Sequence, residues 1–161
     1  MTQSFGQWFA QFLLSTVTVV IGWIVVHNLT VKRDSDKNRR EMVANSADAL
    51  IESLNELLEK AIAYHVASLR NEVYEGGLKI GLQDLMNRVR SLRQISADIS
   101  HNNACSSTTR AFWRAVTSKH FEDEHEGPLA FGDPQLQLIA AEADRAKQSL
   151  LNLKFRQFPI V

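Results

Sequence analysis

Hydrophobic and polar positions divide the chain into an apolar N-terminal stretch and a longer amphipathic remainder. The first 31 residues contain no Asp, Glu, Lys or Arg, and their strongly apolar part is Phe9–Val26. As a helix this part spans about 27 Å, and the hydrocarbon core of a bilayer is about 30 Å thick. The stretch Ser4–Leu29 therefore predicts a single transmembrane helix, so we expect a transmembrane segment at residues 1–31 and one helical domain at residues 32–161.

The first part of this helical domain has a regular apolar repeat without any Gly or Pro before Gly76. Such 4/3 spacing predicts a long amphipathic helix, which we expect to end at Gly76–Gly77. It either continues the membrane helix or begins near Asn28–Asp36, where Asp and Ser can cap it. The repeat fits a coiled coil between subunits or a helix packed in its own bundle, and we favour the bundle. The repeat comprises Val43, Ala47, Leu50, Leu54, Leu57, Ala61 and Tyr64, and a neighbouring row comprises Ile51, Leu58, Ile62, Leu69 and Val73.

Three further amphipathic stretches predict helices at about 78–101, 108–121 and 134–155. A short loop, Asn102–Ser107, separates the first two, and an acidic loop precedes the last. Asp133–Pro134 is typical of a helix start, with an N-cap residue before a proline in the first turn. No strand pattern is evident in the sequence. We therefore expect an all-α protein, in which one N-terminal transmembrane helix is followed by a cytosolic four-helix domain.

The distribution of charge and the cysteine content predict the cellular compartment of this domain. Basic residues flank only the C-terminal side of the apolar stretch, and the 18 basic residues of the chain balance 18 acidic ones. The positive-inside rule then predicts a single-pass inner-membrane protein with its N-terminus outside and its C-terminal domain in the cytoplasm. The single Cys105 excludes an internal disulfide and fits a reducing compartment. A cleaved signal peptide is disfavoured because no basic residue precedes the apolar stretch. The balanced charge gives no reason to expect DNA as a partner.

The predicted membrane helix carries a stripe of polar and small residues on one side. Such residues allow helices to associate in lipid, where hydrophobicity does not drive association. We expect contact between copies of the chain, in a homo-oligomer such as a tetramer, and a pore is a further option. Alternatively, the Ser and Thr hydroxyls bond to their own helix. The residues expected to mediate association are Gln11, Ser15, Thr18 and Gly22.

The stretch His101–Arg114 is the candidate ligand site. If a helix begins near Thr108, its first N–H groups are free to bind phosphate, and arginines add charge-assisted hydrogen bonds. Trp113 or Phe112 can stack on a base. The alternative is that the polar residues are ordinary caps and that the aromatic residues fill the core. The expected ligand-binding residues are Asn102, Asn103, Ser106, Ser107, Thr108, Thr109, Arg110, Trp113 and Arg114.

Other candidate chemistry is weaker. The stretch His120–Glu126 contains potential metal ligands, but a solvated acidic loop is the favoured interpretation. Arg114 and His120 match the Arg-x4–6-His motif of HEPN ribonucleases, although Ala115 follows the arginine where that family often has a polar residue. No catalytic set is evident, so we expect neither an enzyme nor a bound cofactor or metal.

The layout of one N-terminal span, a basic junction and a helical cytosolic domain resembles the small membrane effectors of type III CRISPR systems. That resemblance implies a cytosolic domain that binds cyclic oligoadenylate and a membrane helix that responds to it. We therefore expect an antiviral effector in the lipid bilayer that senses a cyclic oligonucleotide and perturbs the membrane as an oligomer. The alternatives are a HEPN-like membrane-bound ribonuclease, a pore-forming CRISPR accessory protein, and a membrane-tethered scaffold without a ligand.

Overall fold

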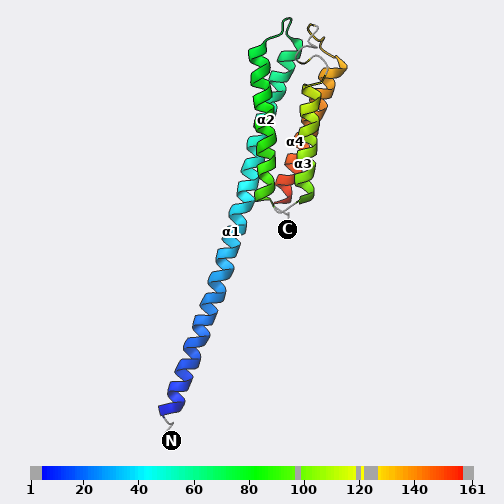
Figure 1. Cartoon of the computed structure of the whole chain (residues 1–161). Helices are drawn as coiled ribbons and strands as arrows, with labels where there is room; N and C mark the ends of the chain where they lie inside the picture. Colours follow the sequence, from blue (N-terminus) through cyan, green and yellow to red (C-terminus); the bar gives the residue numbers. More distant parts are fainter. Residues whose placement is uncertain (1–4, 97–98, 119–120, 122–126, 158–161) are drawn as a thin grey trace. The chain divides into compact units, whose positions relative to one another are not determined.

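The described part of the chain is helical and contains no strand. The computed structural model describes residues 5–96, 99–118, 121 and 127–157, with side chains from Leu14 onward except that of Ile99. The predicted all-α fold is confirmed, since one long N-terminal helix is followed by three more. Figure 1 shows these helices, which are α1 (Phe5–Val66), α2 (Glu72–Ile95), α3 (Ile99–Val116) and α4 (Pro134–Arg156).

The chain forms two compact units, Met1–Asn38 and Arg39–Val161. The first unit contains the N-terminal part of α1, in which every described side chain from Leu14 to Ser35 is exposed. Among the described residues, α1 is the helix long and apolar enough to cross a membrane, and none of its apolar window is buried. The helix also passes through Asn28–Asp36, so the continuing helix is correct and a break with a new N-cap is not.

The second unit is a bundle of four helical segments, the Arg39–Val66 part of α1 together with α2, α3 and α4. Its core is built from apolar positions at helical spacing on all four segments. All seven residues of the Val43–Tyr64 repeat are buried within this one chain, as are Leu82 and Leu85 of α2, Phe112 of α3 and Ile139 of α4. The interpretation of the repeat as part of its own bundle is confirmed, because a buried stripe is not available for a coiled coil between subunits.

The connection between α1 and α2 corrects one predicted boundary. α1 ends at Val66 rather than at Gly76–Gly77, and both glycines lie inside α2. Asn71 caps α2, since its side-chain oxygen accepts a hydrogen bond of 3.0 Å from the backbone N–H of Tyr74. Each glycine inside α2 lowers helix stability by about 1 kcal/mol. The N-cap at Asn71 and the acidic residues of the first turn stabilise the start of the helix and offset that loss.

Glu75, in the first turn of α2, is a buried carboxylate with two cationic partners. Its oxygens accept hydrogen bonds of 3.0 Å from Arg70 Nε and 2.9 Å from Lys79 Nζ. Burial by itself raises the pKa of Glu75, but the hydrogen bonds and the charges of Lys79 and Arg70 more than offset it, so the pKa lies below its ordinary value. The ion pairs therefore fix the start of α2 against the preceding turn.

Polar contacts between helices complete the bundle. His65, fully buried at the end of α1, donates from Nε2 to the carbonyl of Val116 at 3.0 Å. Lys154 of α4 pairs with Asp48 of α1 at 2.7 Å. The predicted start of α4 is confirmed, since Asp133 Oδ1 accepts a hydrogen bond of 2.7 Å from the N–H of Gln135 and Pro134 is the first helical residue.

Candidate functional site

The loop predicted at Asn102–Ser107 is wrong, because α3 begins at Ile99 and includes all of it. Hydroxyl groups in this stretch bond back to the preceding turn of the helix instead of capping a new one. Ser106 Oγ donates to the carbonyl of Asn102 at 2.9 Å, and Thr108 Oγ1 donates to the carbonyl of Ala104 at 3.0 Å. The residues near Thr108 therefore lie in the interior of a helix, where backbone N–H groups are already bonded, and the helix-terminus argument for phosphate binding fails.

Five of the nine predicted ligand residues are buried or half-buried in the bundle. Asn102 and Thr109 are buried, and the amide of Asn102 donates to the carbonyl of Ser96 at 3.3 Å. Ser106 and Thr108 are half-buried, and the Thr108 hydroxyl lies 2.8 Å from Ser149 Oγ of α4. Trp113 is also half-buried and packs against the core. For these residues the alternative interpretation, a role in packing, is the one that their burial supports.

The other four predicted residues share an exposed face of α3. Asn103, Ser107, Arg110 and Arg114 are all exposed. Their spacing of four, three and four residues places them on one side of the helix. The structure thus keeps both arginines of the predicted site accessible, with one amide and one hydroxyl beside them.

Two arginines of α2 that the ligand prediction did not include face the same seam. α2 contacts α1 through Arg88, whose Nη1 donates to Ser53 Oγ at 2.7 Å, and Arg90 lies about 200° further around the helix. α3 contacts α4 through Thr108, and Arg110 lies about 200° from it. α2 and α3 pack against each other, so the side of α2 away from α1 and the side of α3 away from α4 belong to the same outer face of the bundle. We call the exposed residues along this seam, Arg90, Arg93, Arg110 and Arg114, the arginine surface.

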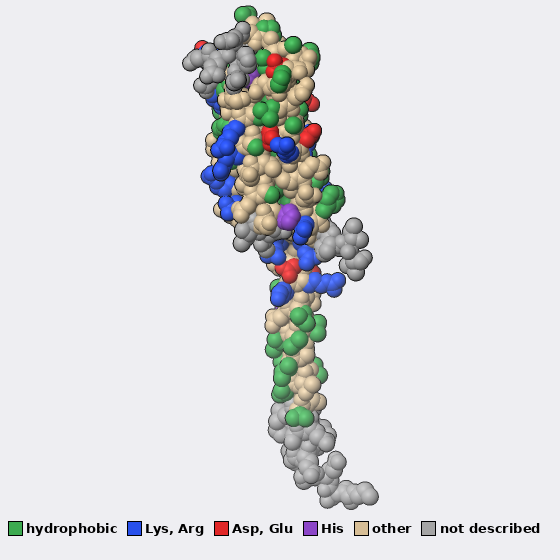
Figure 2. Space-filling model, turned by 90° about the vertical axis from the view of Figure 1, so that its right-hand side faces the viewer, with side chains coloured by type: hydrophobic (Ala, Val, Ile, Leu, Met, Phe, Trp, Pro, Cys, Tyr) green, Lys and Arg blue, Asp and Glu red, His purple; other side chains and the backbone are tan. Residues whose placement is uncertain are grey.

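The charge of the arginine surface is not neutralised within the described part of the chain, where none of its four guanidinium groups forms an ion pair. α3 contains no acidic residue. α2 has acidic residues at Glu72 and Glu75 in its first turn and one further along, Asp84, which lies 3.8 Å from Arg88. Figure 2 shows Lys and Arg side chains gathered along one edge of the helical unit. An exposed planar guanidinium group binds phosphate or carboxylate oxygens through paired hydrogen bonds.

A local signal in the sequence pointed to this surface. Between Leu85 and Ser118 the chain has five arginines and a single acidic residue, Asp98. The neutral total charge concealed this asymmetry. The pairing of α2 with α3 across the seam was not readable from the sequence, because it depends on which helices become neighbours.

The predicted association stripe lies in the first unit. Ser15, Thr18 and Gly22 are exposed, and a Cβ at Gly22 would meet no atom of this chain within 4 Å. Thr18 Oγ1 donates to the carbonyl of Leu14 at 2.8 Å, which is the bond back to the helix that was the alternative for this residue. The side chain of Gln11 lies outside the described residues. Association of the membrane helices stays a prediction.

The remaining candidate chemistry falls mostly on residues that the structure does not describe. His120 and residues 122–126 lie outside the described part, so the metal cluster and the pairing of Arg114 with His120 stay untested. Within the described part, no group of three or more His, Cys, Asp and Glu residues is placed to hold a metal ion. Cys105 is buried, and its thiol donates to the carbonyl of Ser149 at 3.3 Å.

Comparisons with known protein families, with characterised proteins and with solved structures give no match for this chain. The arginine surface and the exposed apolar part of α1 are therefore the two features on which a function can be argued.

Proposed function

We propose that this protein is a single-pass membrane receptor whose helical unit binds an anionic nucleotide on the arginine surface. The observation that carries the proposal is the absence of any ion pair for Arg90, Arg93, Arg110 and Arg114 in the described part of the bundle. Exposed guanidinium groups that have no ion pair within the described residues keep their N–H donors open to a polyphosphate ligand, which would form charge-assisted hydrogen bonds with them.

The membrane part of the proposal follows from the first unit. Its apolar side chains are exposed from Leu14 to Val31, and an exposed apolar helix of this length is satisfied by lipid. The basic residues that follow it favour an N-terminus outside and a helical unit in the cytoplasm of the cell, at the inner membrane.

A cyclic oligonucleotide is the ligand class that best fits a symmetric assembly. In a homo-oligomer such as a tetramer, each copy presents the same arginines to one repeat of a cyclic phosphate backbone, so modest contacts add up. If two arrangements of the subunits bind the ligand with different affinity, binding shifts the membrane helices from one to the other. The resemblance to type III CRISPR membrane effectors makes cyclic oligoadenylate the first ligand to test and an antiviral role the corresponding biology.

The test is a titration of cyclic and linear oligoadenylates against the full chain in lipid nanodiscs, followed by native mass spectrometry. We expect binding of the cyclic ligand with a fixed ratio of ligand to chains. Combined replacement Arg90→Gln and Arg110→Gln should weaken binding by about 100-fold or more, since each charged hydrogen bond contributes about 1.5–3 kcal/mol. Affinity should also fall steeply with added salt.

Lys147→Gln is the matched control, because it removes one positive charge from α4 and leaves only the exposed Asp144 without its partner. It should change affinity by less than about twofold. If neither cyclic nor linear oligoadenylate binds at micromolar concentration, the nucleotide proposal is wrong. That result would favour the alternative of a membrane-tethered scaffold without a ligand. RNA cleavage that disappears in Arg114→Ala and His120→Ala would support the HEPN-like nuclease instead.

A further inference from the structure

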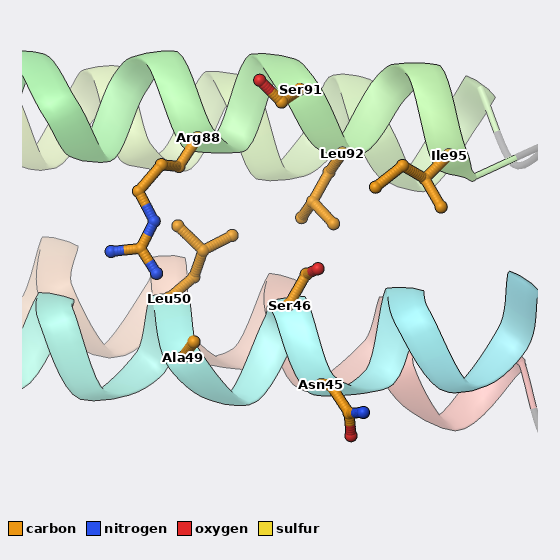
Figure 3. A pocket seen from close by; sticks show the side chains of 8 residues that line it. All are labelled: Asn45, Ser46, Ala49, Leu50, Arg88, Ser91, Leu92 and Ile95. Carbon is orange, nitrogen blue, oxygen red and sulfur yellow. The ribbon is translucent and has the colours of Figure 1, made fainter.

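A groove lies between α1 and α2, apart from the arginine surface. Its volume is about 340 Å³, which is within the range of small-molecule sites. Figure 3 shows it from close by, with side chains of α1 and α2 facing each other across the gap. Its lining includes Ser46, Ala49 and Leu50 of α1 and Arg88, Leu92 and Ile95 of α2.

The groove exists because the two helices change how closely they pack along their length. Near Gly81 they are in tight contact, since a Cβ on Gly81 would lie 2.6 Å from Cδ2 of Leu57. Two turns and more further along α2, the α1 side offers Ser46 and Ala49, whose short side chains leave the space opposite Leu92 and Ile95 unfilled. The Ser46 hydroxyl points toward α2 in Figure 3 and forms no hydrogen bond within the described part of the chain.

The chemistry of the groove differs from one end to the other. At one end, Arg88 reaches across to α1, where its Nη1 donates to Ser53 Oγ at 2.7 Å. Its other partner, Asp84, is 3.8 Å away and largely exposed, and such a surface pair contributes little. A guanidinium group has five N–H donors, so Arg88 retains donors for a ligand. From Arg88 to Ile95 the groove extends over about 10 Å, the rise of seven helical residues. Its lining there combines the apolar side chains of Leu50, Leu92 and Ile95 with the polar residues Asn45, Ser46 and Ser91.

We propose that this groove binds a small amphipathic carboxylate, with its anionic head on Arg88 and its aliphatic body along Leu50, Leu92 and Ile95. An extended chain of about nine atoms spans about 10 Å, as three extended residues of a polypeptide do. The body is therefore a medium-length aliphatic chain such as that of octanoate. This inference is independent of the proposed function, because Arg88 and the arginine surface lie on opposite sides of α2.

The experiment uses the full chain in lipid nanodiscs with ¹³C-labelled Ile and Leu methyl groups, titrated with octanoate and compared with empty nanodiscs. We expect saturable shifts of the Ile95 methyl signals, while those of Ile139, fully buried in α4, stay in place. Octanol has the same body without the charge, and it should bind at least about tenfold more weakly because it gains no charge-assisted bond.

Two variants and one control separate the groove from general partitioning into lipid. Arg88→Gln should weaken octanoate binding about tenfold or more, and Ala49→Leu should abolish it by filling the groove. Arg156→Gln removes the same charge from an exposed position of α4 outside the groove and should leave affinity within about twofold. Thermal unfolding of each variant checks that the bundle remains folded. If the Ile95 signals do not saturate below about 10 mM octanoate, or if Arg88→Gln binds as the unmodified chain does, the proposal is wrong.

Discussion

The two parts of α1 have the same backbone conformation and opposite relations to their surroundings. Between Leu14 and Val31 the helix exposes every side chain, including valines, isoleucines and Trp23. Between Val43 and Tyr64 it exposes most of its polar side chains and buries one apolar stripe against α2, α3 and α4. The formation of a helix therefore decides neither environment by itself. The first part is a mostly apolar helix that is exposed and long enough to cross a bilayer, whereas an apolar stripe packs against neighbouring helices.

The largest effect should come from removing a core side chain in the second part of α1. Leu54 is fully buried, so Leu54→Ala should lower the free energy of unfolding of the bundle by about 2–5 kcal/mol. Leu14→Ala makes the same chemical change at a position that is 73 % exposed and should leave the bundle unaffected. Chemical unfolding in mild detergent, followed by circular dichroism, measures both. Equal destabilisation by the two variants would contradict the division of α1 into two environments.

The second largest effect should come from placing a charge in the first part of α1. Val17→Arg places a guanidinium group near the centre of the apolar segment, where insertion into a bilayer costs about 2.5–3.5 kcal/mol. We expect a marked loss of protein from carbonate-washed membranes. Asn55→Arg adds the same charge at an exposed position of the bundle and should not change membrane recovery. Full recovery of Val17→Arg in the membrane fraction would argue that the segment does not span the bilayer.

The smallest predicted effect is a change in the pH dependence of stability, and it arises at the connection between α1 and α2. The pKa of Glu75 is lowered, so its ion pairs stabilise the bundle above the ordinary glutamate pKa of about 4.3. That contribution is lost as the pH falls through the lowered pKa. Glu75→Gln should therefore flatten the decline of stability below about pH 4.3. Glu52→Gln, at an exposed position without an ion pair in the described residues, should leave the decline unchanged. If Glu75→Gln shows the same dependence of stability on pH as the unmodified chain, the ion pairs of Glu75 do not contribute to the stability of the bundle.

The sequence predicted the helices better than their boundaries. Periodic Leu and Ala positions identified the buried stripe of α1 because burial and the helical repeat coincide there. The Ser, Thr and Asn residues near Ser106 resembled a loop, yet they are compatible with a helix whose hydroxyls bond to the previous turn. The glycines at 76 and 77 resembled a helix end, but the cap at Asn71 starts α2 before them.

The candidate site was predictable only in part. Arg110 and Arg114 could be selected from their local sequence, and both are exposed. Arg90 and Arg93 join them only because α2 and α3 become neighbours, which is a property of tertiary packing. The groove beside Arg88 depends on the side-chain sizes of Ser46 and Ala49 on another helix, and no local pattern reports such a combination.

The contact between Asp48 and Lys154 has a consequence for how the protein is made. It joins residues 106 positions apart, on the first and last helices of the bundle. During synthesis the apolar stripe of α1 therefore emerges from the ribosome long before α4 exists to cover it. At translation rates of about 5–20 residues per second, the stripe waits several seconds for its last partner. During that interval, contacts with α2 and α3 are the first within this chain that can cover the stripe.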